Sequence, residues 1–301
     1  MSLFRVDVLA RSTHVAPKTF EVVCAIQRAR PAPQPGDNVL HKSVVGAALA
    51  ATLSFAATSA LAADIIALTP GNSLVFIGGD MKAGRETAIT GIGGRVVGID
   101  VRSSDGMLYA VTDQGGIYTV TPSTGMAKMV STLSEKFDAG MHPVVDFNPV
   151  ADRLRLIGAN GVSFRVEVET GKVTIDKPLV YDAADANNGK KPMVLAGAYT
   201  NAMAGAKGTE LLHVEGTAGV LVLQAPPNDG ILKTRGSLGL MAPPRNVAMD
   251  IHTDASGKNT GWLLADGKLH EVDLATGKPN AGMMIAGLSK PIVDIAVVER
   301  R

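Results

Sequence analysis

The stretch Val96–Thr132, VVGIDVRSSDGMLYAVTDQGGIYTVTPSTGMAKMVST, decides the fold. It contains an apolar strand ending in Gly98-Ile99-Asp100, a turn at Asp105-Gly106, two further strands, and a second turn at Thr124-Gly125. Short alternating strands separated by such turns indicate antiparallel β-structure. Asp-Gly favours a tight hairpin because glycine adopts positive φ at little steric cost.

The first strand of this stretch recurs along the chain. Its counterparts are Val144–Phe147, Ala248–Ile251 and Ile292–Ile295, and a further copy, Ala196–Tyr199, lacks the acid. The spacings between successive copies, counted from Asp100 to Asp146, Ala198, Asp250 and Asp294, are 46, 52, 52 and 44 residues. Repeats of about 40–50 residues, each with several strands, are typical of propeller blades.

The two ends of the repeat region are incomplete in complementary ways. Ile65–Ile92 contains later strands, at Ser73–Ile77 and Glu86–Ile89, but no acid-bearing first strand, whereas Pro291–Val298 is a first strand alone. Joining the two halves into one blade pairs the open edges and closes a ring. A sandwich would not need complementary half-units. The sequence therefore predicts an all-β fold, a five-bladed β-propeller closed by the N- and C-terminal strands of the mature chain.

The first 62 residues have a different character. His41-Lys42 precede the uncharged run Ser43–Ser59 and the small-residue ending Ala60-Leu61-Ala62, which is typical of a secretory signal. A buried Ala-rich helix is the alternative. We expect residues 1–38 to be an upstream segment outside the mature protein, with translation starting near Val39 or Leu40. Residues 39–62 would be a signal peptide, and 63–301 a single propeller domain that is exported to the periplasm or beyond the cell.

Charge and cysteine content exclude several classes of partner and chemistry. Residues 1–62 hold six Lys/Arg and three Asp/Glu of the chain's 29 and 28, so the remainder carries 23 basic and 25 acidic residues. A balance near −2 does not favour nucleic acid or an anionic membrane as partner. The only cysteine, Cys24, lies upstream of the signal, so the mature chain has no disulfide or thiolate. We expect a monomer without a membrane span, whose partner is an unknown protein or a small-molecule ligand.

Four acids occupy corresponding places in the repeats: Asp100, Asp146, Asp250 and Asp294. On innermost strands they would surround one rim of the central channel, where converging carboxylates can bind a cation or a ligand or perform acid–base chemistry. The alternative is a structural role, in which each acid accepts backbone hydrogen bonds in its own or the adjacent blade and has a lowered pKa. We favour the structural role because Ala198 replaces the acid in one unit.

The most polar insertion is Tyr181–Gly189, in which Asp182, Asp185 and Asn187 offer hard oxygen ligands suited to calcium. The segment lacks the 1-3-5 spacing and the later Glu of a helix–loop–helix calcium site. A capped surface loop is the alternative. We therefore expect no cofactor, with calcium as the other possibility.

Other chemistry-bearing residues are scattered. The histidines at 142, 213, 252 and 270 form no local metal motif, and no Gly-x-Ser-x-Gly elbow is present. His252 follows Asp250 by two residues and could face the same side of its strand. The single tryptophan, Trp262, is expected to pack between blades.

Three stretches carry a resemblance to a known family: Phe147–Gly158 (FNPVADRLRLIG), Asp185–Ala202 (DANNGKKPMVLAGAYTNA) and Gln224–Gly239 (QAPPNDGILKTRGSLG). Together they resemble the bacterial family called domain of unknown function 4394 (DUF4394), over roughly Ile65 to Val298. The resemblance implies an exported, propeller-like bacterial protein. It implies no activity, catalytic residue or ligand.

Three function classes follow. The first is a non-catalytic exported propeller that binds a protein or a small ligand, or serves as a scaffold. The second is a hydrolase with carboxylates from different blades at the channel mouth. The third is a calcium-stabilised, envelope-associated structural protein. The sequence favours the first class, because it contains no local catalytic motif.

Overall fold

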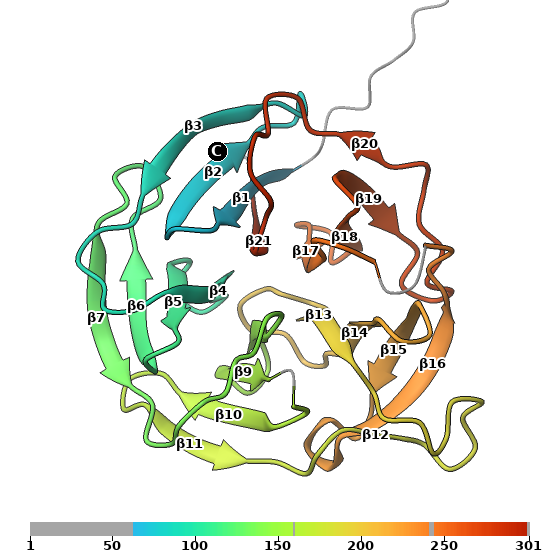
Figure 1. Ribbon diagram of the computed structural model, residues 1–301. Coiled ribbons are helices and arrows are strands. Elements are labelled where there is room, and N and C mark those ends of the chain that lie inside the picture. The colour runs from blue at the N-terminus through green and yellow to red at the C-terminus, as the bar shows by residue number, and fades with distance from the viewer. Residues whose placement is uncertain (1–62, 159, 241–243, 300–301) are drawn as a thin grey trace, which may run out of the picture. The chain divides into compact units, whose positions relative to one another are not determined.

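The computed structural model describes residues 63–158, 160–240 and 244–299. Within these ranges the chain forms five β-sheets, and the only helical element described is a short 3-10 turn, Pro227–Asp229. The sheets stand around a central axis as the blades of a five-bladed β-propeller (Figure 1). The predicted fold class is confirmed. The expected upstream segment (1–38) and signal peptide (39–62) lie outside the described residues.

Within each blade, neighbouring strands run antiparallel from the axis outward, and blade 4 has one additional parallel strand at its outer edge. Blade 1 consists of β21 (Asp294–Glu299), β1 (Ala63–Thr69), β2 (Ser73–Ile77) and β3 (Ala83–Ala88). Blade 2 consists of β4 (Val96–Val101), β5 (Leu108–Thr112), β6 (Gly116–Val120) and β7 (Ala127–Thr132). Blade 3 consists of β8 (Val144–Asn148), β9 (Arg153–Ile157), β10 (Ser163–Glu167) and β11 (Lys172–Ile175).

The remaining two blades follow the same order. Blade 4 consists of β13 (Val194–Tyr199), β14 (Leu211–Glu215), β15 (Val220–Gln224) and β16 (Ile231–Ser237), with the short β12 (Val180–Tyr181) added in parallel at its outer edge. Blade 5 consists of β17 (Ala248–Thr253), β18 (Asn259–Ala265), β19 (Lys268–Val272) and β20 (Met283–Met284).

Burial changes across each blade, from the axis to the rim. The inner strands are covered on both faces by neighbouring blades; all five residues of β5, for example, are buried. A strand buried on both faces needs apolar side chains at successive positions, which explains runs such as Leu-Tyr-Ala-Val. The outer strands β3, β7 and β11 have no buried residue. Apolar clusters fill the spaces between blades, and Trp262 is buried in the cluster between blades 5 and 1, as expected.

The ring closes where the sequence predicts. Strand β21 pairs antiparallel with β1, in a register that runs from Ala63 opposite Glu299 to Leu68 opposite Asp294. The hairpin between β18 and β19 also matches its prediction, since Asp266 and Gly267 both have positive φ, 50° and 80°. At Asp105-Gly106 only the glycine has a positive φ, so this turn is of a different type.

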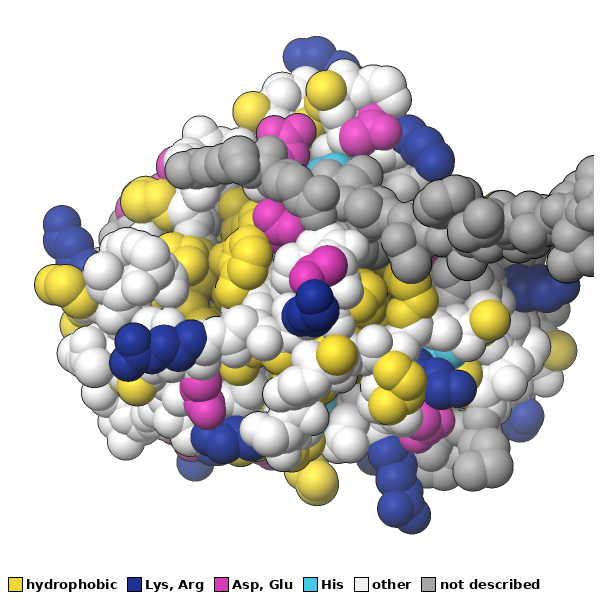
Figure 2. Space-filling model, turned by 90° about the horizontal axis from the view of Figure 1, so that it is seen from above, with side chains coloured by type: hydrophobic (Ala, Val, Ile, Leu, Met, Phe, Trp, Pro, Cys, Tyr) yellow, Lys and Arg dark blue, Asp and Glu magenta, His cyan; other side chains and the backbone are white. Residues whose placement is uncertain are grey.

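Charged side chains of both signs are interspersed over the face shown in Figure 2, without a large area of one sign. This distribution agrees with the near-neutral charge of residues 63–301. No helix in the described part of the chain is long and apolar enough to cross a membrane.

Candidate functional site

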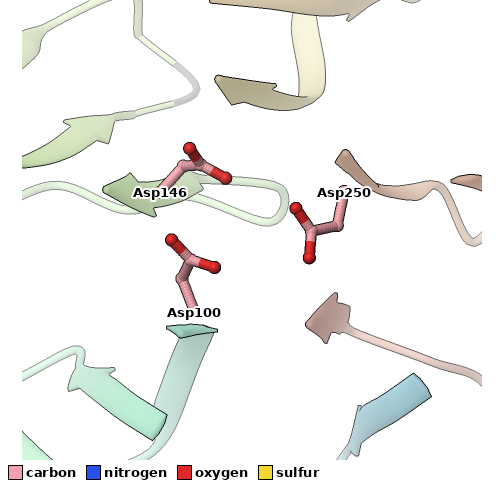
Figure 3. A group of neighbouring side chains, drawn as sticks. All are labelled: Asp100, Asp146 and Asp250. Carbon is pink, nitrogen blue, oxygen red and sulfur yellow. The ribbon is translucent and has the colours of Figure 1, made fainter. Parts of the chain in front are cut away.

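Three aspartates from three blades converge near the axis. Asp100 lies on β4, Asp146 on β8 and Asp250 on β17, and each carries a carboxylate oxygen within 4.8 Å of an oxygen of the other two. Figure 3 shows the three carboxylates pointing toward one another. All three residues are buried, with exposed fractions of 5–7%. We call Asp100, Asp146 and Asp250 the axial triad.

Each carboxylate of the axial triad ties its own blade to the next one. In every case a carboxylate oxygen accepts a backbone N–H from the innermost strand of the following blade. The donors are Phe147 N to Asp100 Oδ2 (2.7 Å), Tyr199 N to Asp146 Oδ1 (2.9 Å) and Val297 N to Asp250 Oδ2 (2.6 Å). Asp100 and Asp250 also accept the N–H of the residue that follows them, both at 2.6 Å. The predicted backbone hydrogen bonding is confirmed.

Asp294 is not equivalent to the axial triad. Its Oδ2 accepts the N–H of Ile99, the residue before Asp100, at 2.9 Å. In the axial triad the N–H donor is always the residue that follows the equivalent position of the next blade; Phe147, for example, follows Asp146. Asp250 accepts the N–H of Val297, so Ala296, not Asp294, is the residue of β21 that is equivalent to the triad. The expectation of four equivalent acids is therefore corrected to three. Gly98 makes the displaced position possible, because a Cβ atom there would lie 2.9 Å from Asp294 Oδ2.

The pKa values of these carboxyls shift upward, opposite to the prediction. Burial raises the pKa of Asp100 and Asp146 well above the usual range, and the charges of neighbouring axial acids add to the rise. Burial likewise raises the pKa of Asp250, to about 6, and that of Asp294. Loss of hydration thus outweighs the backbone N–H donors, which favour the ionised form. A group of this kind can share protons or hold a hard cation.

A pocket of about 360 Å³ lies at the ends of the innermost strands, with a lining that includes Val101, Thr253 and Val298. The axial triad does not line this pocket. His252 does, and its Nε2 is shielded from solvent and has no hydrogen-bond partner among the described residues.

The polar loop before blade 4 is fastened to the blade by its own oxygens. Asp185 accepts the N–H and the hydroxyl of Thr234 (2.6 and 3.0 Å), and Asn187 donates to the same hydroxyl at 3.2 Å. Asp182 accepts the N–H of Ala184 at 2.9 Å. Burial works to raise the pKa of Asp185, but these hydrogen bonds prevail and lower it. The structure therefore favours the capped loop, and the calcium site proposed for this loop stays a prediction.

A larger pocket, of about 800 Å³, lies between blades 4 and 5, and no sequence pattern predicted it. We call it the blade 4–5 pocket. Asn201 and Asn259 join the two blades beside it through two hydrogen bonds, of 2.7 and 2.8 Å. Arg235 of β16 forms an ion pair with Glu210 at 2.6 Å on the blade 4 side. Strand β19 and the loop after it provide the blade 5 side.

A buried polar cluster between blades 3 and 4 was also not predicted. The side chain of Arg155 is only 1% exposed and forms an ion pair with Asp176, 4% exposed, at 2.6 Å. It also donates to Tyr199 Oη and Asn228 Oδ1, both in the blade 4 part of the chain. His213 is fully buried in blade 4, and its burial lowers its pKa to about 4.

Comparisons with known proteins add a family but no activity. Two solved structures that are similar to this chain are of bacterial proteins of unknown function. One, from Bacteroides caccae, is 10% identical with a TM-score of 0.41, over 80% of this chain and 100% of the other. The second, from Bacteroides thetaiotaomicron, is 14% identical with a TM-score of 0.48, over 77% of this chain and 64% of the other. No curated protein matches.

The sequence resemblance is confirmed by a family model, which matches residues 76–296, most of the chain. The model describes a domain of unknown function. The protein is therefore a member of the DUF4394 family, with the fold of a five-bladed β-propeller.

Proposed function

We propose that the protein is an exported, non-catalytic binding protein that takes a small ligand in the blade 4–5 pocket. One observation carries this proposal: a pocket of about 800 Å³ in which polar side chains from two blades converge. Concave sites of 300–1,000 Å³ with a few convergent polar groups are the usual form of small-molecule sites. Propellers host many unrelated functions, so the proposal rests on the pocket and not on the fold.

The placement of the axial triad supports a non-catalytic role. All three carboxylates accept backbone N–H groups that join blades, and none of them lines the pocket of about 360 Å³ at the ends of the innermost strands. An acid that acts in catalysis must come within hydrogen-bond reach of a substrate. The triad is better suited to holding the blades together.

A blocked pocket tests the proposal. Ala275 is exposed and lines the blade 4–5 pocket, so Ala275→Trp should obstruct the pocket without disturbing the core. The control Ala151→Trp places the same side chain in an exposed turn of blade 3. Both proteins and the wild type would be screened by thermal shift against sugars, organic acids, amino acids and nucleotides.

We expect at least one compound to raise the melting temperature of the wild type and of Ala151→Trp but not of Ala275→Trp. The compound should be recovered chemically unchanged. Equal responses from all three proteins, or none from any, would refute the proposal. Recovery of a hydrolysed product would favour the hydrolase hypothesis instead.

One observation favours a second candidate, a calcium-stabilised envelope protein: the three axial carboxylates converge within 4.8 Å. Three carboxylates supply only part of the coordination sphere of calcium, which takes about six to eight oxygen ligands. Backbone N–H groups already occupy both oxygens of Asp100 and of Asp250. We therefore rank this candidate second.

A further inference from the structure

The blade 4–5 pocket contains two kinds of polar group, those already used by the fold and those left over. Asn201 and Asn259 bond to each other across the blades. Asp273 accepts the N–H groups of Ala275 and Thr276, at 2.9 and 3.0 Å, and so fixes its own turn. These hydrogen bonds already use Asn201, Asn259 and Asp273 Oδ1, so a ligand depends mainly on the other polar groups of the lining.

The remaining groups are both donors and acceptors. Among the described residues, the side chains of Thr260, Glu271 and Lys278 have no hydrogen-bond or ion-pair partner, and neither has Asn280 Nδ2. A hydroxyl donates and accepts, a carboxylate accepts, and an ammonium or amide nitrogen donates. The pocket thus offers mixed hydrogen bonding from neighbouring positions.

Arg235 has unused hydrogen-bonding capacity as well. One of its terminal nitrogens, Nη2, is held by Glu210, at 2.6 Å. Its Nε is shielded from solvent and has no acceptor among the described residues. Buried donors normally have a partner, so an unpaired one calls for an explanation such as an oxygen atom absent from the structure. Because Arg235 lines the pocket, a ligand oxygen is a candidate for this acceptor.

The charge of the lining decides between classes of ligand. Three acids and two bases line the pocket, a formal charge of −1: Glu210, Glu271 and Asp273 against Arg235 and Lys278. With the signs so nearly balanced, neither a polyanion nor a polycation finds a complementary field. Among the residues that the structure describes, no aromatic side chain lines the pocket, so a flat aromatic ligand finds no stacking partner there.

From these observations we infer that the blade 4–5 pocket binds a neutral polyhydroxylated compound of the sugar or cyclitol class, with Arg235 and Thr260 as specificity-determining residues. Each hydroxyl of such a ligand both donates and accepts, which matches the mixed groups of the lining. The volume of about 800 Å³ accommodates one to a few sugar rings. This inference rests on the proposed function and specifies its ligand.

Saturation-transfer NMR on the full chain tests the inference. The neutral probes are D-glucose, maltose and myo-inositol, and the charged probes are citrate and spermidine. The variants are Arg235→Ala and Thr260→Val, the second of which removes only a hydroxyl in nearly the same volume. Arg95→Ala is the matched control, because Arg95 is a half-exposed arginine paired with Asp113 in blade 2.

We expect signals from at least one neutral probe with the wild type and Arg95→Ala, and their loss, or an at least tenfold weaker affinity, in Arg235→Ala and Thr260→Val. A neutral probe that binds all four proteins equally would overturn the site. Binding of citrate or spermidine alone, dependent on Arg235, would overturn the ligand class and leave the proposed binding function intact. Absence of all signals, together with no response in the blocked-pocket screen, would overturn both.

Discussion

Burial of Asp250 makes the stability of this protein depend on pH in an unusual direction. The pKa of Asp250 rises from 3.8 to about 6 on folding, so folding favours the protonated form. The corresponding stabilisation is complete below the unfolded pKa and is lost as the pH rises through about 6. A shift of about two pKa units corresponds to about 3 kcal/mol in total.

Between pH 5 and pH 8 the expected change is smaller. At pH 5 the folded carboxyl is mostly protonated and the unfolded one mostly ionised, which leaves about 1.4 kcal/mol of the effect by the linkage relation. For a domain of this size, that corresponds to about 3–6 °C in melting temperature. The charge of Asp250 also raises the pKa of Asp100, which adds to the effect in the same direction.

Wild-type data alone would not isolate this contribution. Burial lowers the pKa of His213 to about 4, so protonation of the unfolded histidine reduces stability as the pH falls, which opposes the effect of Asp250. The measurement is therefore the difference in melting temperature between wild type and Asp250→Asn, from pH 5 to pH 8. The contribution of His213 cancels in this difference.

The wild type should lose about 3–6 °C relative to Asp250→Asn over this range. Loss of an accepted N–H bond in the variant shifts the whole curve without changing its slope. The control is Asp229→Asn, at an exposed carboxylate paired with Lys177. The melting temperature of the wild type minus that of Asp250→Asn should therefore fall as the pH rises from 5 to 8; if this quantity stays constant or rises, the reasoning that burial dominates the pKa of Asp250 is refuted.

Four further predictions concern the buried ion pair, closure, calcium and export. Arg155→Ala should lower the free energy of unfolding by about 2–5 kcal/mol because it leaves a cavity and removes the donor to buried acceptors, although Arg165 still pairs with Asp176, whereas the half-exposed Arg153→Ala should cost under about 1 kcal/mol; equal losses in urea titrations would contradict this. Deletion of Pro291–Arg301 should abolish cooperative unfolding by exposing the edge of β1, and unchanged melting would argue against it. Calcium or its chelation by EDTA should leave the melting temperature unchanged; a calcium-dependent rise lost in the Asp250→Asn variant would favour the cation site. If the proposed export takes place, N-terminal sequencing of protein recovered from outside the cytoplasm should begin near Ala63, and a mature chain retaining the upstream cysteine would disprove export by this signal.

The sequence predicts the blades because their signals are local. A strand of five or six residues and its turn lie within one stretch, as at Asp266-Gly267, and the same pattern returns in each unit. The closure is predictable for a related reason. Complementary half-units at the two ends of a repeat region have only one way to complete a blade.

The position of Asp294 could not be predicted in the same way. A displacement of two residues along a strand keeps every side chain on the same face, so the apolar pattern fits both alignments. In the sequence, Asp294 therefore resembles the acids of the axial triad. The bonds from Val297 N to Asp250 and from Ile99 N to Asp294 show that Ala296 is the true counterpart.

The sites between blades depend on distances that the sequence does not contain. Asn201 and Asn259 are separated by 58 positions, and the blade 4–5 pocket exists only because two blades bring them together. In the sequence Arg-Leu-Arg, Arg155 has the pattern of a surface residue, but in the structure it is buried with Asp176 and with Tyr199 and Asn228 of blade 4 as partners. The upward pKa shifts have the same origin, since loss of hydration is a property of the assembled axis and not of any one strand.

The pairing of β1 with β21 also sets the order of folding. Ala67 lies opposite Ile295, 228 positions later in the chain, so blade 1 cannot be completed until the last strand has been synthesised. Contacts so distant in sequence are formed late and slow the overall rate. Until then β1 presents an unpaired inner edge, which is a template for association with other chains. We therefore expect a nascent chain of this protein to be prone to aggregation until β21 has been synthesised.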